Sequence, residues 1–173
     1  MTVPEVNPEP TFEEAIATTR QLLDNFVVGA LTADQLQTAI ITLLRTSNGA
    51  RGFFVVWLTH DWLVSLAPIV HALNAHPDPS RELMVKNLVM STAMAINHQR
   101  QGNPTQAQMS LATARRSTEL LNQWKHPHLA SIVQSMIASI DTDGGDYGSF
   151  LHKWGYDTEQ KQAMKSALLA LNL

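Results

Sequence analysis

The stretch that decides the fold reads Leu83-Met84-Val85-Lys86-Asn87-Leu88-Val89-Met90-Ser91-Thr92-Ala93-Met94-Ala95-Ile96-Asn97-His98. Apolar residues occur on nearly every side of it at helical spacing. A helix that is apolar all round is usually buried among other helices. The sequence therefore predicts a long central helix over residues 80–101, capped by Asp78 or Ser80 and stopped by Gly102-Asn103-Pro104.

A polar row interrupts this helix. Asn87, Ser91 and His98 fall near one line, because residues three, four or seven apart share a helical face. One interpretation is that the row lines a polar pocket or faces the polar groups of a partner. The other is structural: Ser91 bonds back to the carbonyl one turn earlier, and solvent or the helix dipole satisfies His98. The structural interpretation is favoured, since buried polar groups are usually just hydrogen-bonded.

Capping signals place helices on both sides of the central one. Thr11 with Glu14, and Thr32 with Gln35, match the capping box and predict two helices that begin after the threonines. Ser47-Asn48-Gly49 is expected to end the second helix. Further helices are expected over residues 49–59 and after a cap at Thr59 or Asp61. Beyond the central helix, helices are expected to begin at Pro104 or Thr105, with Pro127 in a first turn, and after Asp157 or Thr158. One helical turn is expected between Tyr147 and Tyr156.

These signals predict an all-α fold, a single compact bundle of about seven helices around the central buried helix. The chain has 173 residues, which fits one domain with a proper core. Residues 1–10 carry three prolines among acidic residues and predict a flexible N-terminal arm, which leaves residues 11–173 as a single helical domain. No period of about 34 or 40 residues marks a helical repeat array.

The composition bounds the partners and the chemistry. Charged residues make up 16% of the chain, below the usual quarter or so, which favours self-association or a protein partner. The formal net charge of −3 gives no general attraction to nucleic acid. The absence of cysteine excludes disulfides, cysteine zinc sites and thiol catalysis.

No transmembrane segment is expected, since the longest apolar run, residues 53–58, is far short of the ~20 residues required. Residues 1–5 do not resemble a signal peptide, and we expect a cytoplasmic protein.

A second candidate site surrounds Arg51, which stands between Gly49 and Gly52. Two glycines let backbone approach closely, and a helix start binds anions through its free N–H groups. Arg51 would then clamp a carboxylate or phosphate with two parallel hydrogen bonds. The rival interpretation, which is favoured, is a structural role in a turn between helices.

Aromatic residues gather just after this turn, at Phe53, Phe54, Trp57 and Trp62. Core packing is the default interpretation of such a cluster. Phe53, Trp57 and Trp62 are also candidates for a docking surface, because aromatic residues are enriched at the centres of interfaces. Contact with a membrane surface is a further alternative, although only Arg51 supplies positive charge nearby.

No metal, cofactor or catalytic residue is expected. The seven histidines form neither a His-x-x-x-His pair nor a Glu-x-x-His pair, the patterns of metalloproteases and di-iron bundles.

Two stretches, residues 49–59 and 83–94, resemble a group of small helical proteins of cyanobacteria to which no activity is assigned. The resemblance covers about residues 49–110. It implies a cytoplasmic protein of a photosynthetic bacterium and brings no catalytic residue with it.

The function expected from these features is a non-enzymatic helical module for protein interaction or regulation that associates with itself as a homodimer or binds a protein partner. The alternative is a small-ligand binder or enzyme. In that case Arg51, Asn87, Ser91 and His98 would line one polar pocket beside the central helix.

Overall fold

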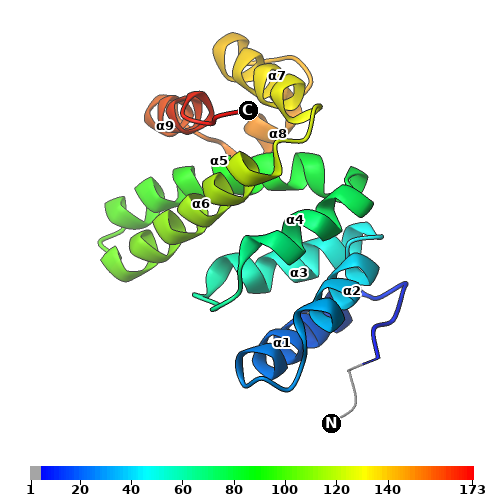
Figure 1. Cartoon of the computed structure of the whole chain (residues 1–173). Helices are drawn as coiled ribbons and strands as arrows, with labels where there is room; N and C mark the ends of the chain where they lie inside the picture. Colours follow the sequence, from blue (N-terminus) through cyan, green and yellow to red (C-terminus); the bar gives the residue numbers. More distant parts are fainter. Residues whose placement is uncertain (1–4) are drawn as a thin grey trace. The chain divides into compact units, whose positions relative to one another are not determined.

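The computed structural model describes residues 5–173, and within that range the chain forms nine helices and no strand. The prediction of an all-α fold is confirmed (Figure 1), although the helix count is higher than the seven or so expected. The helices are α1 (Phe12–Val27), α2 (Ala33–Leu43), α3 (Ser47–Thr59), α4 (Leu66–Ala75), α5 (Asp78–Arg100), α6 (Pro104–Trp124), α7 (Leu129–Thr142), α8 (Gly148–Trp154) and α9 (Thr158–Leu169).

The chain divides into two compact units, residues 1–83 and 84–173. We call them the N-terminal and the C-terminal unit. Whether they form the single domain predicted for residues 11–173 stays a prediction. Residues 1–4 of the predicted flexible arm lie outside the described residues, and residues 5–10 are not helical.

In the N-terminal unit, both predicted capping boxes start their helices. Glu14 N–H donates to Thr11 Oγ1 at 3.2 Å, and Thr11 N–H donates to Glu14 Oε2 at 2.8 Å. Thr32 and Gln35 make the same reciprocal pair at 3.2 and 2.9 Å. These contacts satisfy N–H groups that have no partner inside a first helical turn.

The expected end of the second helix is wrong. Residues 47–49 do not stop α2, which ends at Leu43, but form the first turn of α3. Thr46 is the cap, and its Oγ1 accepts from Gly49 N–H at 3.1 Å. A Ser-Asn-Gly run fits a helix end and a helix start equally well, and here the threonine before it decides the outcome.

The glycines of α3 let this helix lie close to its neighbours. A Cβ atom on Gly52 would lie 2.4 Å from Ala15 Cβ in α1. A Cβ on Gly49 would lie 1.9 Å from the Leu43 carbonyl oxygen at the end of α2. The packing of α3 against α1 and against the end of α2 therefore requires two positions without side chains. In this unit α1 packs mainly on α3, and α2 packs mainly on α4.

α4 begins later than expected, at Leu66, so neither Thr59 nor Asp61 caps it. The chain leaves α3 at Thr59 and is non-helical until Leu66, so Pro68 occupies the first turn of α4 rather than kinking a longer helix. Proline is tolerated there because the first-turn N–H groups have no partner in the helix.

The central helix, α5, is 23 residues long and is the longest of the described helices. No residue from Leu83 to His98 is exposed, as its all-round apolar character predicts. The expected cap differs: Asp78 and Ser80 both lie inside the first turn. The Pro77 carbonyl oxygen accepts from Ser80 N–H and Arg81 N–H, both at 3.1 Å.

Within the C-terminal unit, α5 turns into α6 at Gly102, whose φ of +69° suits glycine. Asn103 N–H donates to the His98 carbonyl oxygen at 2.9 Å, and Asn103 Oδ1 accepts from Gln106 N–H at 3.3 Å. This tight turn makes α5 and α6 an antiparallel pair (Figure 1). The predicted stop at 102–104 is confirmed, with Asn103 as the cap and Pro104 in first position.

Each of the remaining helices follows a left-handed residue, which for α9 is Gly155 with a φ of +61°. Lys125 ends α6 with a φ of +46°, and Asp143 ends α7 with a φ of +54°. Pro127 precedes the α7 cap, His128, instead of lying in the first turn as expected. α7 packs on α9 and on the short helix α8, where only one helical turn was expected.

Candidate functional site

The residues predicted to line one polar pocket belong to different units. Arg51 lies in the N-terminal unit, and Asn87, Ser91 and His98 lie in the C-terminal unit. The pocket therefore stays a prediction. Each unit is described below by itself.

Arg51 is exposed, and its guanidinium carbon lies 4.8 Å from the centre of the Phe12 ring. This distance is typical of a cation–π contact between α3 and α1. The two neighbouring glycines have a packing reason of their own, the close approach of α3 to Ala15 and Leu43. Residues 49–52 lie inside α3 and not in a turn between helices, and their geometry supports a structural role at least as directly as an anion clamp.

The aromatic cluster of α3 is buried. Phe53 and Phe54 are each 1% exposed and Trp57 is 5% exposed. The Phe53 and Phe54 rings meet edge to face with centroids 5.1 Å apart, and the Trp57 ring lies nearly parallel to Phe53 at 6.5 Å. Edge-to-face and offset pairs are the favourable arrangements of aromatic rings in a core.

Trp62 stands apart from this buried cluster. It lies in the connection between α3 and α4, is half-buried, and donates from its indole N–H to the Val56 carbonyl oxygen at 3.1 Å. The next residue, Leu63, has 85% of its surface exposed. Of the three aromatic docking candidates, Phe53 and Trp57 are buried, whereas Trp62 is half-buried and precedes an exposed leucine.

The polar row of α5 is half-buried along its length, at Asn87, Ser91 and His98. The hydroxyl that bonds back to the helix on this stretch is that of Thr92, which donates to the Leu88 carbonyl oxygen at 2.8 Å. The local explanation offered for Ser91 therefore applies to its neighbour. Half-burial leaves the row open to either interpretation.

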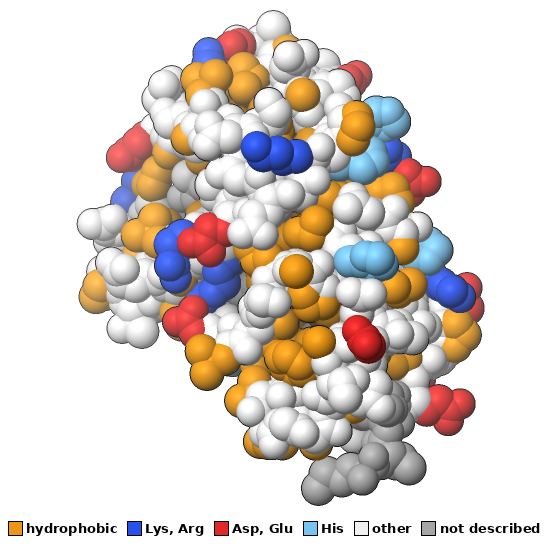
Figure 2. All heavy atoms as spheres, viewed as in Figure 1, with side chains coloured by type: hydrophobic (Ala, Val, Ile, Leu, Met, Phe, Trp, Pro, Cys, Tyr) orange, Lys and Arg blue, Asp and Glu red, His pale blue; other side chains and the backbone are white. Residues whose placement is uncertain are grey.

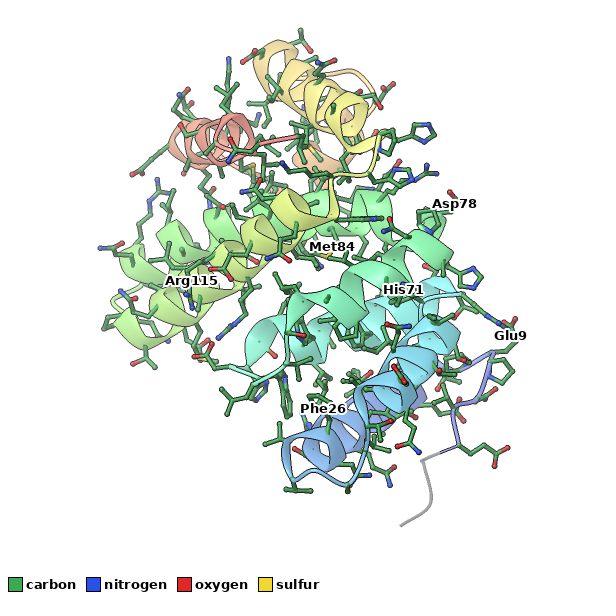
Figure 3. The ribbon with its side chains drawn as sticks, in the orientation of Figure 1. Glu9, Phe26, His71, Asp78, Met84 and Arg115 are labelled. Carbon is green, nitrogen blue, oxygen red and sulfur yellow. The ribbon has the colours of Figure 1, made fainter. Side chains whose placement is uncertain are left out.

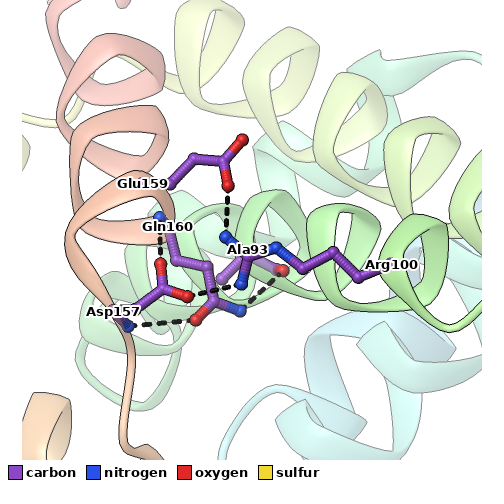
Figure 4. A network of polar contacts seen from close by, with 5 residues as sticks. All are labelled: Ala93, Arg100, Asp157, Glu159 and Gln160. Atoms are coloured by element: carbon purple, nitrogen blue, oxygen red, sulfur yellow. Dashed lines mark hydrogen bonds and ion pairs between the residues drawn. The ribbon is translucent and has the colours of Figure 1, made fainter.

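A polar network that the sequence did not reveal joins α9 to α5 (Figure 4). The Arg100 guanidinium pairs with the carboxylates of Asp157 and Glu159. Beside these pairs, Gln160 Nε2 donates to the Ala93 carbonyl oxygen at 3.1 Å. Gln160 is 8% exposed and its Oε1 also accepts from Asp157 N–H at 3.1 Å. One amide thus caps α9 and docks it on the central helix.

Ionic contacts continue across α7 and α9. Lys165 Nζ lies 2.7 Å from Asp141 Oδ1, and Asp143 pairs with Lys161 and with His152, whose Nε2 lies 3.2 Å away. The hydrogen bond from Lys161 is the main reason that the pKa of Asp143 is lowered. Exposed pairs of this kind contribute little to stability individually.

The Arg100 pairs predict a specific pH dependence. The hydrogen bond from Arg100 is the main cause that lowers the pKa of Asp157 in the folded chain. A lowered folded pKa stabilises the fold above the ordinary Asp value of about 3.9, and this contribution is lost as the pH falls through the folded value. The pairs are exposed, so Arg100→Gln should lower the urea midpoint at pH 7 by a small amount, through the loss of two carboxylate contacts at once, and make progressively less difference below about pH 4.

The matched control is Arg115→Gln. Arg115 lies on α6 (Figure 3) and approaches Glu119 only to 3.7 Å, as an exposed pair on one helix. Its replacement should barely change the midpoint at either pH. An Arg100→Gln effect of equal size at pH 7 and pH 2.5 would contradict the assignment.

Aromatic residues form a second feature that the sequence did not single out, at α8. Lys86 Nζ lies 5.4 Å from the centre of the Tyr147 ring and 5.6 Å from that of Phe150. The Phe150 and Tyr156 rings lie 6.3 Å apart, and burial raises the pKa of Tyr156 to about 12. Trp154 is 51% exposed. The available signal was the spacing of Tyr147, Phe150 and Trp154, three and four residues apart, whereas Tyr156 lies beyond the end of α8.

The described residues contain no group of three or more His, Asp or Glu side chains placed to hold a metal ion. Between residues 5 and 173, no helix is long and apolar enough to cross a membrane. Hydrophobic side chains reach the surface at several places on the face shown in Figure 2, among acidic and basic side chains.

Comparison with known proteins identifies a family. No curated protein and no solved structure matches the chain. One family model, described as uncharacterised conserved protein UCP020893, matches residues 11–171. The match begins at the first capping box and ends just beyond the last helix, α9, so it takes in both units. The chain therefore belongs to the uncharacterised conserved protein family UCP020893.

Proposed function

We propose that this protein is a non-enzymatic helical interaction module that binds a second copy of itself. The observation that carries the proposal is the exposure of Leu63, at 85%, in the connection between α3 and α4. Connections between helices are usually polar and are where binding residues concentrate. A leucine left in water here loses about 1.5–3 kcal/mol of burial free energy, which a partner would recover.

The loop that presents Leu63 is held in place. Trp62 donates from its indole N–H to the Val56 carbonyl oxygen, and its ring lies 5.7 Å from that of His60. A fixed loop loses less conformational entropy on binding than a mobile one. The small share of charged residues, 16%, also leaves less polar surface to oppose association.

A symmetric dimer would place Leu63 of each copy in the same interface, because a twofold axis pairs one patch with itself. Size-exclusion chromatography with light scattering, over a range of concentrations, should show a dimer. Leu63→Ser should raise the dimer dissociation constant about tenfold or more, which corresponds to ~1.4 kcal/mol or more.

The control is Leu169→Ser, at an exposed leucine of the C-terminal unit that is 65% exposed. It should leave the dissociation constant unchanged. A protein that stays strictly monomeric at every concentration and brings no partner through purification would overturn the proposal. Equal weakening by the two substitutions would show that the effect is not specific to Leu63 and would contradict its assignment to the interface.

A further inference from the structure

The aromatic face of α8 combines one exposed ring, that of Trp154, with positive charge, and its other rings are half-buried or buried. We define it by the aromatic residues Tyr147, Phe150, Trp154 and Tyr156 and by Lys86 and Lys153. Lys153 Nζ lies 5.6 Å from the centre of the Trp154 ring, and Lys86 Nζ lies 5.4–5.6 Å from Tyr147 and Phe150. Phe150 and Trp154 are four residues apart, so both rings lie on one side of the short helix.

Two observations at this face favour a ligand that carries an apolar ring and a negative charge. Trp154 leaves 51% of its surface in water although a tryptophan is among the costliest residues to expose. Lys153 forms no ion pair with any carboxylate of residues 5–173, whereas the neighbouring Lys161 and Lys165 are paired with Asp143 and Asp141. An indole beside an unpaired ammonium group suits an apolar ring flanked by a carboxylate.

The same chain contains a segment with this chemistry. In residues 5–9, Glu5, Pro8 and Glu9 are exposed, and no positive charge lies among them. Asn7 Oδ1 accepts from Glu9 N–H at 3.0 Å, and Pro8 has a fixed φ, so the segment is already ordered in a bend. An ordered segment binds with a smaller loss of entropy.

We propose that the aromatic face of α8 binds residues 5–9 of a second copy of the chain, with Pro8 against Trp154 and Glu9 against Lys153. The complementary charges fix the direction of the segment, and the proline ring covers indole surface. This contact uses a surface other than the Leu63 loop, so either interface can fail experimentally without the other.

The chemistry of the contact is tested by fluorescence polarisation with a labelled peptide of residues 1–11. The receptor is the full chain carrying Glu5→Lys and Glu9→Lys, so that its own arm does not compete. The peptide should bind, with an affinity that falls as salt is added. Trp154→Ala in the receptor should weaken binding about tenfold or more, and Lys153→Glu should weaken it and reduce the salt dependence.

Two controls make the result decisive. A peptide with both glutamates changed to lysine should not bind, and Leu169→Ser in the receptor should leave binding of the original peptide unchanged. Lys153→Glu alters an exposed side chain and tests the contact even if Trp154→Ala disturbs folding. Absence of binding, or equal binding of the two peptides, overturns the proposal.

The origin of the segment is tested on the unaltered full chain. Ordinary and isotope-labelled protein are mixed and treated with a zero-length carboxyl–amine cross-linker, which would join Glu9 to Lys153. Cross-linked peptides that combine one ordinary and one labelled partner are the expected result. Cross-links found only within a single isotope form would overturn the assignment to a second copy.

Discussion

Replacing Gly49 with alanine is expected to lower the free energy of unfolding by about 3 kcal/mol, at the upper end of the usual range for overpacking. The added methyl carbon would lie 1.9 Å from the Leu43 carbonyl oxygen and 2.8 Å from its carbonyl carbon. Both atoms belong to the backbone at the end of α2, so no side chain can rotate away. Either α3 must move from α2 or the first turn of α3 must open.

The gain in helix propensity works against this loss. Alanine favours a helix interior over glycine by roughly 0.8–1.0 kcal/mol, and by less in the first turn, where Gly49 lies. The steric conflict is the larger effect because it involves distances at which no carbon atom is found. Urea unfolding followed by circular dichroism measures the difference.

Gly144→Ala is the matched control. It is the same chemical change at a glycine where the nearest atom to a new Cβ, the Thr142 carbonyl oxygen, lies at an ordinary 3.9 Å. This variant should be as stable as the original, or more stable by about 0.4–1 kcal/mol through a more restricted unfolded chain. Equal stability of Gly49→Ala and Gly144→Ala would contradict the close approach of α3 to α2.

The role of Gly49 shows where sequence reasoning stops. The capping boxes at Thr11 and Thr32 were predictable because their partners stand three residues away in the sequence. The need for glycine at position 49 arises from a carbonyl oxygen that only the packed fold brings near. The composition of residues 47–49 showed that they lie at a helix boundary. It did not show whether they end α2 or begin α3.

The same distinction applies to the candidate sites. The spacing within the central helix predicted the line of Asn87, Ser91 and His98, since a helix fixes such neighbours. Arg100 meets Asp157 and Glu159 across 57 and 59 residues, and no local pattern marks such partners. Gln160 stands three residues after Asp157, and nothing in this local spacing marks the contact of its amide with the Ala93 carbonyl oxygen.

Replacing Phe53 with alanine is expected to cost about 3–5 kcal/mol of unfolding free energy, the range for a large buried aromatic side chain. Phe53 is 1% exposed and its ring contacts Phe54 edge to face. Truncation removes apolar contact area and leaves a cavity that the surrounding helices fill only in part. A loss of this size is a large fraction of the stability of an ordinary domain.

This substitution also separates the two interpretations of the aromatic cluster. A docking residue would weaken association and shift the unfolding transition only at concentrations where the protein is dimeric, which is the result expected for Leu63→Ser. A core residue shifts the unfolding transition at every protein concentration. Tryptophan fluorescence is a suitable readout, because Trp57 and Trp62 report on the N-terminal unit and Trp124 and Trp154 on the C-terminal unit.

Val55→Ala is the control for Phe53→Ala on the same helix, since Val55 is 42% exposed. It removes less apolar area from a side chain that water already reaches, and it replaces a β-branched residue with a better helix former. Its effect should stay within about 0.5 kcal/mol. If Phe53→Ala changed stability no more than Val55→Ala, the aromatic cluster of α3 would have to be assigned to a docking surface instead of the core.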